Sequence, residues 1–166
     1  MRFSDICESV CCETLIVMPE QETIARARED AREGKSPSAQ AGEFVREEME
    51  HIREGKHGAR SAKQAIAIGL SKARRAGVPL SPPKTGTTSR RTRKQAKRDI
   101  AKGRRGERKP NPRRSRAVKR RLKKEPRSAA SHRALSRQAH AAARKRTAAG
   151  RSRSARKPAR TRKRRR

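Results

Sequence analysis

The basic residues of this chain are concentrated in its second half, and this distribution most strongly limits what the chain can fold into. Residues 1–80 carry 13 Lys and Arg against 13 Asp and Glu, whereas residues 81–166 carry 36 against 3, so the net charge of +33 lies in the second half. Large apolar side chains are scarce there. Because such a segment cannot offset its ordering entropy by burial, we expect residues 81–166 to be largely disordered.

We predict an all-α protein in which a short helical hairpin, of two or three helices, precedes a long, largely disordered basic tail. Residues 1–17 form an N-terminal extension, for which two interpretations stay open: a miscalled start, with Met18 as the true one, or a short N-terminal arm. Residues 18–80 form a helical module with an αα-hairpin over residues 38–76. Residues 81–166 form the nucleic-acid-binding tail, which ends in a low-complexity Arg, Ser and Ala sequence.

The neutral half carries clear signals for its first two helices. The first helix is predicted over residues 19–33. Pro19 lies in its first turn, where the missing N–H of proline costs nothing, and Gly34 follows its last residue as a C-terminal cap. Residues 38–54 begin near a serine and end at Gly55. Their apolar side chains recur at i, i+4 and i+7, as expected for a helix with one buried face; these residues are Val45, Met49 and Ile52, with Phe44 beside them.

A third helix is predicted over residues 62–76. Ser61 and Gln64 have the spacing of a capping box, and Gly77 followed by Val78 suits a left-handed C-terminal cap. Small residues on the inner face would allow the preceding helix to approach closely. In the second half, two segments have weaker helix patterns. Residues 89–102 need a packing partner to form a helix, and residues 128–149 can form one once the repulsion between their cations is relieved.

The segment from Glu43 to Pro79 contains the sequence Lys-Gln-Ala-Ile-Ala-Ile-Gly-Leu-Ser-Lys-Ala-Arg-Arg-Ala-Gly over residues 63–77. It resembles a domain of unknown function in small basic bacterial proteins, some of which are labelled plasmid stabilisation or DNA-binding. The resemblance implies a bacterial source and a helical hairpin, and it supplies no functional residues. The tail is similar in composition to bacterial histone-H1-like proteins.

The composition of the tail predicts a nucleic-acid partner. Arginine presents a planar fork of donors that matches phosphate oxygens, and no aromatic residue follows Phe44 to stack on unpaired bases. We therefore expect backbone contacts with duplex DNA, in preference to RNA. The candidate nucleic-acid-binding residues are Arg90, Arg91, Arg93, Lys94, Lys97, Arg98, Arg104, Arg105, Arg113, Arg114, Arg116, Lys119, Arg120, Arg121, Arg144, Lys145, Arg146, Arg162, Lys163, Arg164, Arg165 and Arg166.

Three further motifs have weaker functional interpretations. The sequence Gly55-Lys56-His57-Gly58 matches the loop that clamps RNA in KH domains, but no segment has the strand pattern that such a domain needs. The hairpin is also compatible with a helix-turn-helix in which cations of residues 62–76 touch DNA. Glu48 and His51 have the Glu-x-x-His spacing of di-iron bundles, which require two such motifs. We expect this acidic helix to be exposed, with its glutamates paired to Arg46 and Arg53 or to the basic tail.

The sequence predicts no enzyme, no cofactor and no metal. Catalytic motifs are absent, and Cys7, Cys11 and Cys12 lack a nearby fourth ligand for zinc. The predicted function is non-specific DNA binding through the phosphate backbone, of nucleoid-associated or histone-H1-like type; the alternative is an RNA- or ribosome-associated protein. We expect a cytoplasmic, nucleoid-associated protein with no small-molecule substrate and no membrane contact, and the hairpin is a candidate for homodimerisation.

Overall fold

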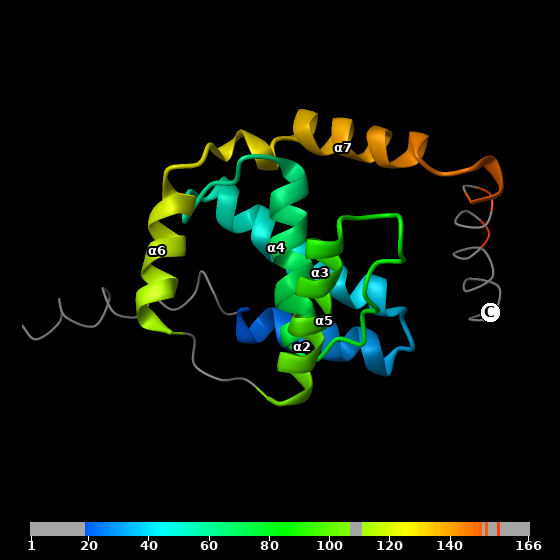
Figure 1. The fold of residues 1–166 in the computed structure, drawn as a ribbon, viewed down its shortest axis with the longest axis horizontal. Coiled ribbons are helices and arrows are strands. Elements are labelled where there is room, and N and C mark those ends of the chain that lie inside the picture. The colour runs from blue at the N-terminus through cyan, green and yellow to red at the C-terminus, as the bar shows by residue number, and fades with distance from the viewer. Residues whose placement is uncertain (1–18, 107–110, 151, 153–155, 157–166) are drawn as a thin grey trace, which may run out of the picture.

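The structure is a computed structural model that describes residues 19–106, 111–150, 152 and 156. These residues form helices and connecting loops and contain no strand. The helices are α2 (Gln21–Arg32), α3 (Pro37–Arg53), α4 (Ala62–Arg75), α5 (Arg90–Arg104), α6 (Pro112–Lys123), a short 3-10 helix η1 (Arg127–Ala130) and α7 (His132–Arg144). Figure 1 shows α4 near the centre of the arrangement, with α6 to one side and α7 across the end where α4 begins.

The helix ends of the first half follow from local capping chemistry. The Ser61 side chain accepts a hydrogen bond from the Gln64 N–H at 3.3 Å, as predicted. The Gln64 side chain reaches back one residue further than a standard capping box, because its Oε1 accepts from the Arg60 N–H at 3.2 Å. At the other end of α4, Gly77 has a φ of +93° and the Val78 N–H donates to the Ala73 carbonyl at 3.1 Å, which is the predicted C-terminal cap.

Helices α3 and α4 pack against each other at very short range. A Cβ atom added to Gly69 of α4 would lie 2.7 Å from Val45 Cα and 2.9 Å from the Phe44 carbonyl oxygen. Real Cβ atoms do not approach backbone atoms this closely, so only glycine fits at this position. The expected close approach is therefore confirmed, and it sets the spacing of the hairpin on which the other helices pack.

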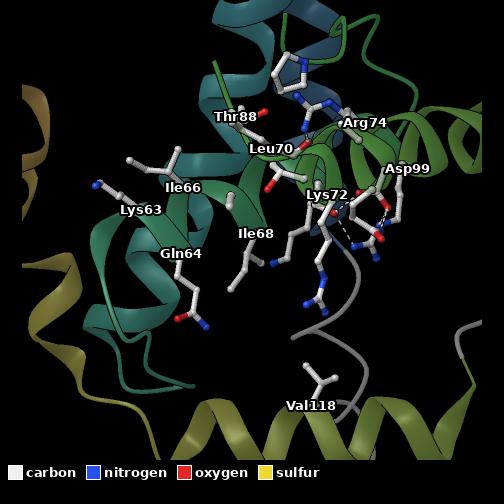
Figure 2. A pocket seen from close by; sticks show the side chains of 18 of the residues that line it. Lys63, Gln64, Ile66, Ile68, Leu70, Lys72, Arg74, Thr88, Asp99 and Val118 are labelled. Atoms are coloured by element: carbon white, nitrogen blue, oxygen red, sulfur yellow. Dashed lines mark hydrogen bonds and ion pairs between the residues drawn. The ribbon is translucent and has the colours of Figure 1, made fainter. Parts of the chain in front are cut away.

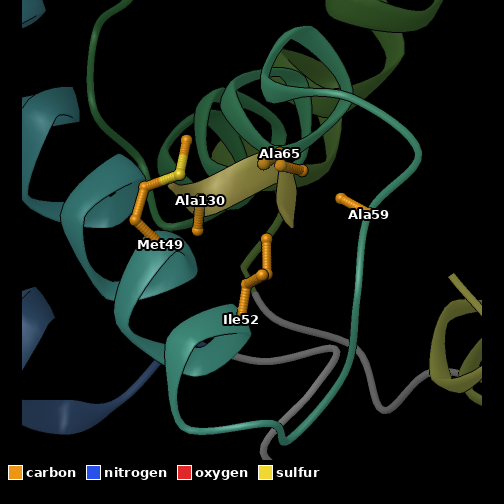
Figure 3. Close-up of a cluster of buried hydrophobic side chains, with 6 residues drawn as sticks. Met49, Ile52, Ala59, Ala65 and Ala130 are labelled. Carbon is orange, nitrogen blue, oxygen red and sulfur yellow. The ribbon is translucent and has the colours of Figure 1, made fainter. Parts of the chain in front are cut away.

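The apolar side chains of the hairpin are buried in two clusters. In the first, Phe44 of α3 is fully buried among alanines, which are Ala27 of α2, Ala41 and Ala73. In the second, Met49 and Ile52 of α3 face Ala59 and Ala65. Figure 3 shows that Ala130 of η1 closes this second cluster from a segment far along the chain. Alanine partners make both clusters small, so the bundle depends on close helix contact.

The prediction that a short hairpin precedes a largely disordered tail is wrong for the described part of residues 81–166. Helix α5 packs on α4, and Ala96 and Asp99 on its inner face are buried. The Asp99 carboxylate accepts from Ser71 Oγ at 2.7 Å and lies 3.2 Å from Arg75 Nε. These contacts supply the partner that residues 89–102 were expected to need.

The segment that joins α6 to η1 is also tied to the hairpin. The Gly58 N–H donates to the Leu122 carbonyl at 2.9 Å, and the Ala59 N–H donates to the Pro126 carbonyl at 3.1 Å. Arg53 Nε donates to the Ala130 carbonyl at 3.2 Å. The few apolar residues of the second half thus complete the core of the first half. Because they do not form a core of their own, an argument from the composition of the tail alone predicts disorder. None of the described helices is long and apolar enough to cross a membrane.

Candidate nucleic-acid interface

Residues 90–98 of helix α5 carry six of the predicted phosphate-binding residues. Its inner face is held on α4 by Ala96 and Asp99, so most of its cations lie on the side that faces solvent. Arg93 is half-buried, and the other five are exposed; these are Arg90, Arg91, Lys94, Lys97 and Arg98. The outer face of α5 is therefore a strip of positive charge on an ordered scaffold.

Helix α6 is amphipathic and basic. Leu122 is buried, and Val118, one turn earlier, is 46% exposed and lines a groove beside α4. Arg113, Arg116 and Arg120 lie at i, i+3 and i+7, so they share one exposed face of the helix. Of the remaining predicted residues, Arg114 and Arg121 are exposed and Lys119 is half-buried. The helix thus offers arginine side chains to solvent, and Leu122 is its one buried side chain.

The other predicted residues lie at helix ends or outside the described structure. Arg104 and Arg105 are exposed at the end of α5. Arg144, Lys145 and Arg146 are exposed at the end of α7. The C-terminal group lies outside the described residues and comprises Arg162, Lys163, Arg164, Arg165 and Arg166.

A groove of about 840 Å³ runs between α4, α5 and α6. Figure 2 shows Ile68 of α4 and Val118 of α6 on its two sides. Cations from all three helices also line it, namely Lys63 of α4, Arg91 of α5 and Arg121 of α6. The fold therefore brings together basic residues that are separated by up to 58 positions in the sequence, which the sequence alone could not show.

Carboxylates are placed so that they do not cover this basic surface. Asp99 is buried and bound to Ser71 and Arg75, and Glu125 is half-buried beside η1. In the neutral half, by contrast, surface cations pair with neighbouring acids, as Arg32 does with Glu29 at 2.7 Å. The positive potential of α5 and α6 is therefore not cancelled by these two described acids of the second half.

Two alternative functional interpretations, the helix-turn-helix and the KH-type loop, depend on side chains that the structure buries. Lys72 and Arg74 are 2% and 9% exposed, so they cannot serve the DNA contacts of a helix-turn-helix. Burial lowers the pKa of Arg74, with the nearby Asp99 charge acting in the opposite direction. His57 and Gly58 are buried as well, so the Gly-Lys-His-Gly loop does not present a clamp for RNA backbone.

The expectation that the acidic residues of α3 are exposed is wrong for Glu47 and Glu48, and His51 beside them is buried as well. Glu47, Glu48 and His51 are each at most 2% exposed. Lys72 of α4 reaches between the two carboxylates, with its Nζ donating to Glu47 Oε1 at 2.9 Å and lying 2.9 Å from Glu48 Oε2. Arg46 pairs with Glu43 and Glu50 as predicted, whereas Arg53 bonds to η1 instead. A helical wheel that placed Glu48 beside Met49 and Ile52 could have revealed the burial.

Two histidines extend this buried polar cluster. His51 Nε2 lies 2.8 Å from Glu20 Oε1, and His57 Nε2 lies 3.3 Å from Glu48 Oε1. The hydrogen bond from His51 is the main cause that lowers the pKa of Glu20, and Lys56 at 3.3 Å adds to it. Partial burial acts against these effects. The N-terminal end of α2 is thereby fixed to α3 and to the loop that follows it.

Comparisons with known proteins identify the central segment only. Residues 32–85 match a family of unknown function, DUF6496. The DUF6496 match spans α3, α4 and the loop that carries His57, and it confirms the expected resemblance to a domain of unknown function. No curated protein and no solved structure matches the chain. The matched segment includes the buried polar cluster and excludes α5, α6 and α7.

Proposed function

We propose that this protein binds duplex DNA without sequence preference, through phosphate contacts made by the outer faces of α5 and α6. The observation that carries the proposal is the placement of exposed arginines and lysines on two ordered helices: α5, whose inner face packs on α4, and α6, which is tied to the bundle at Leu122 near its C-terminal end. Arginine binds phosphate through paired N–H donors. The outer faces of these helices contain no aromatic residue that could stack on bases.

Ordered basic helices have an advantage over a flexible tail in this role. The side chains of Arg113, Arg116 and Arg120 start from one helix face, so less backbone entropy is lost when they contact phosphates. Such contacts position a protein on the duplex without reading sequence. A nucleoid-associated, histone-H1-like role follows from non-specific binding of this kind, and the likeness in tail composition to bacterial histone-H1-like proteins supports it.

The proposal is tested by the salt dependence of binding to a labelled random-sequence duplex. Each phosphate contact contributes about −0.9 to the slope of log K against log salt. Replacing Arg113, Arg116 and Arg120 with Gln should therefore reduce the magnitude of the slope by about 2.7. A fluorescence anisotropy titration at several salt concentrations measures this slope.

A matched control removes the same amount of charge elsewhere. Arg28, Arg32 and Arg60 are exposed cations of the neutral half that do not line the groove, and changing all three to Gln gives the same net charge as the α6 variant. The control should keep a slope close to that of the unmodified protein. Equal loss in both variants would mean that net charge alone drives binding and would refute a dedicated face.

A competition experiment separates DNA from RNA as the preferred partner. Unlabelled duplex DNA should displace the labelled duplex at lower concentration than a structured RNA of equal charge. The reverse order would favour the RNA- or ribosome-associated alternative, because the same arginine faces can contact the phosphates of either polymer.

A further inference from the structure

We propose that Glu48, His51 and His57 form a binding site for a divalent transition-metal ion of the zinc type. The site lies in the core, between α3 and the loop that leads to α4, and is separate from the basic faces of α5 and α6. One ligand atom from each of the three side chains lies within 4.8 Å of the other two, and all three residues are buried.

The hydrogen bonds on the outer side of each imidazole set its tautomer. His51 Nε2 faces the Glu20 carboxylate at 2.8 Å, and His57 Nδ1 faces the Gly58 carbonyl at 3.1 Å. Carboxylate and carbonyl oxygens accept hydrogen bonds, so these two nitrogens carry the protons. The inner nitrogens, His51 Nδ1 and His57 Nε2, are then left with lone pairs in the neutral rings.

The inner atoms face one another without a hydrogen-bond partner. Glu48 Oε1, His51 Nδ1 and His57 Nε2 are buried and make no hydrogen bond within the described structure, whereas Glu48 Oε2 is paired with Lys72. His57 Nε2 and Glu48 Oε1 are 3.3 Å apart, a separation at which two lone pairs repel. Buried polar atoms require a partner, and a cation placed among them provides one for all three side chains at once.

Each candidate ligand also has a neighbour that fixes its orientation. Glu20 holds His51, the Gly58 carbonyl holds His57, and Lys72 Nζ lies 2.9 Å from Glu48 Oε2. Carboxylate and carbonyl partners of this kind are typical of histidines that bind metals. Because Lys72 occupies the side of Oε2, Oε1 is the oxygen available to an ion.

The ligand set indicates the class of metal. Two imidazoles and one carboxylate suit Zn²⁺, Co²⁺ and related ions better than Mg²⁺ or Ca²⁺, which prefer oxygen. A tetrahedral centre with bonds of about 2.1 Å places its ligand atoms about 3.4 Å apart. The 3.3 Å distance between His57 Nε2 and Glu48 Oε1 fits this geometry, and His51 supplies the third ligand atom within 4.8 Å of the other two.

The experiment uses the full chain with Cys7, Cys11 and Cys12 changed to Ser, so that thiols cannot bind the metal. Titration with Co²⁺ should give visible d–d absorption that saturates at one ion per chain and is displaced by Zn²⁺. Glu20→Gln should weaken binding about 10- to 100-fold, and His51→Gln or His57→Gln should weaken it further. The exposed His132 and His140 provide matched controls, because His→Gln at either position should leave the affinity unchanged.

A second measurement does not depend on variants that could fail to fold. Nitrogen NMR shifts of the His51 and His57 rings in the unmodified protein should change at Nδ1 and Nε2, respectively, when Zn²⁺ is added. If the nitrogen shifts of both rings stay unchanged and His57 is protonated on both nitrogens, a proton on His57 Nε2 bonds to Glu48 in place of a metal ion. That result would overturn the proposal. Metal binding that persists in the His51→Gln, His57→Gln double variant would overturn it as well.

Discussion

Replacing Gly69 with Ala tests whether the α3–α4 contact is as close as the structure indicates. In an exposed helix the change stabilises by about 1 kcal/mol, because alanine has the higher helix propensity. At Gly69 the new Cβ would lie 2.7 Å from Val45 Cα and 2.9 Å from the Phe44 oxygen, both backbone atoms. Since backbone must move, overpacking of about 1–3 kcal/mol opposes the gain. The net effect ranges from neutral to about 2 kcal/mol of destabilisation.

Gly42 provides the matched control for this change. It lies in α3, is exposed, and an added Cβ there would meet no atom within 4 Å. Gly42→Ala should therefore stabilise by up to about 1 kcal/mol. Urea unfolding followed by far-UV circular dichroism measures both free energies of unfolding. If Gly69→Ala stabilises the protein as much as Gly42→Ala, the close contact between α3 and α4 does not exist.

Two buried charges give further predictions for the same unfolding assay. Asp99→Asn should destabilise the protein by about 1–3 kcal/mol, because it weakens the hydrogen bond from Ser71 and removes the charge that faces the partly exposed Arg75. Lys72→Met should destabilise it by about 3–5 kcal/mol, because it leaves Glu47 and Glu48 buried without their cation.

Exposed charges supply the controls for these two changes. Lys63 lies nine residues before Lys72 on α4 and is exposed, so Lys63→Met should change the free energy of unfolding by less than about 0.5 kcal/mol. Glu29 forms an exposed ion pair with Arg32, and Glu29→Gln should cost less than about 1 kcal/mol. Equal effects at the buried and exposed positions would contradict the burial of Asp99 and Lys72.

The helices of the first half were predictable because their signals are local. Ser61 caps α4, Gly77 ends it, and the spacing of Met49 and Ile52 marks the inner face of α3. Each signal depends on residues within one or two turns, so it survives without knowledge of the rest of the fold.

The order of the second half was not predictable from its composition. Ala96, Leu122 and Ala130 are too few to build a core of their own, and they are buried because α3 and α4 supply the remaining surface. Asp99 illustrates the same point. In the sequence it is one acid among many cations, and its ion pair with Arg75 forms only when α5 packs on α4. Long-range packing of this kind leaves no periodic signal in the segment itself.

The buried polar cluster was missed for a related reason. Glutamates at Glu47 and Glu48 are normally exposed, and their burial depends on Lys72, which is 24 residues or more away in sequence. His57 lies in a loop between Gly55 and Gly58, and its contact with Glu48 forms only when this loop folds back on α3. The predicted phosphate-binding residues, by contrast, could be chosen from charge alone.

Amide hydrogen exchange of the full chain without nucleic acid tests most directly whether the basic half is folded on the neutral half. The structure predicts that amides of α5 around Ala96 and Ile100 exchange slowly, and that Asp99→Asn accelerates them more than the amides of α3. Exchange of α5 at the rate of an unstructured peptide would contradict the ordered basic face on which the proposed DNA binding depends.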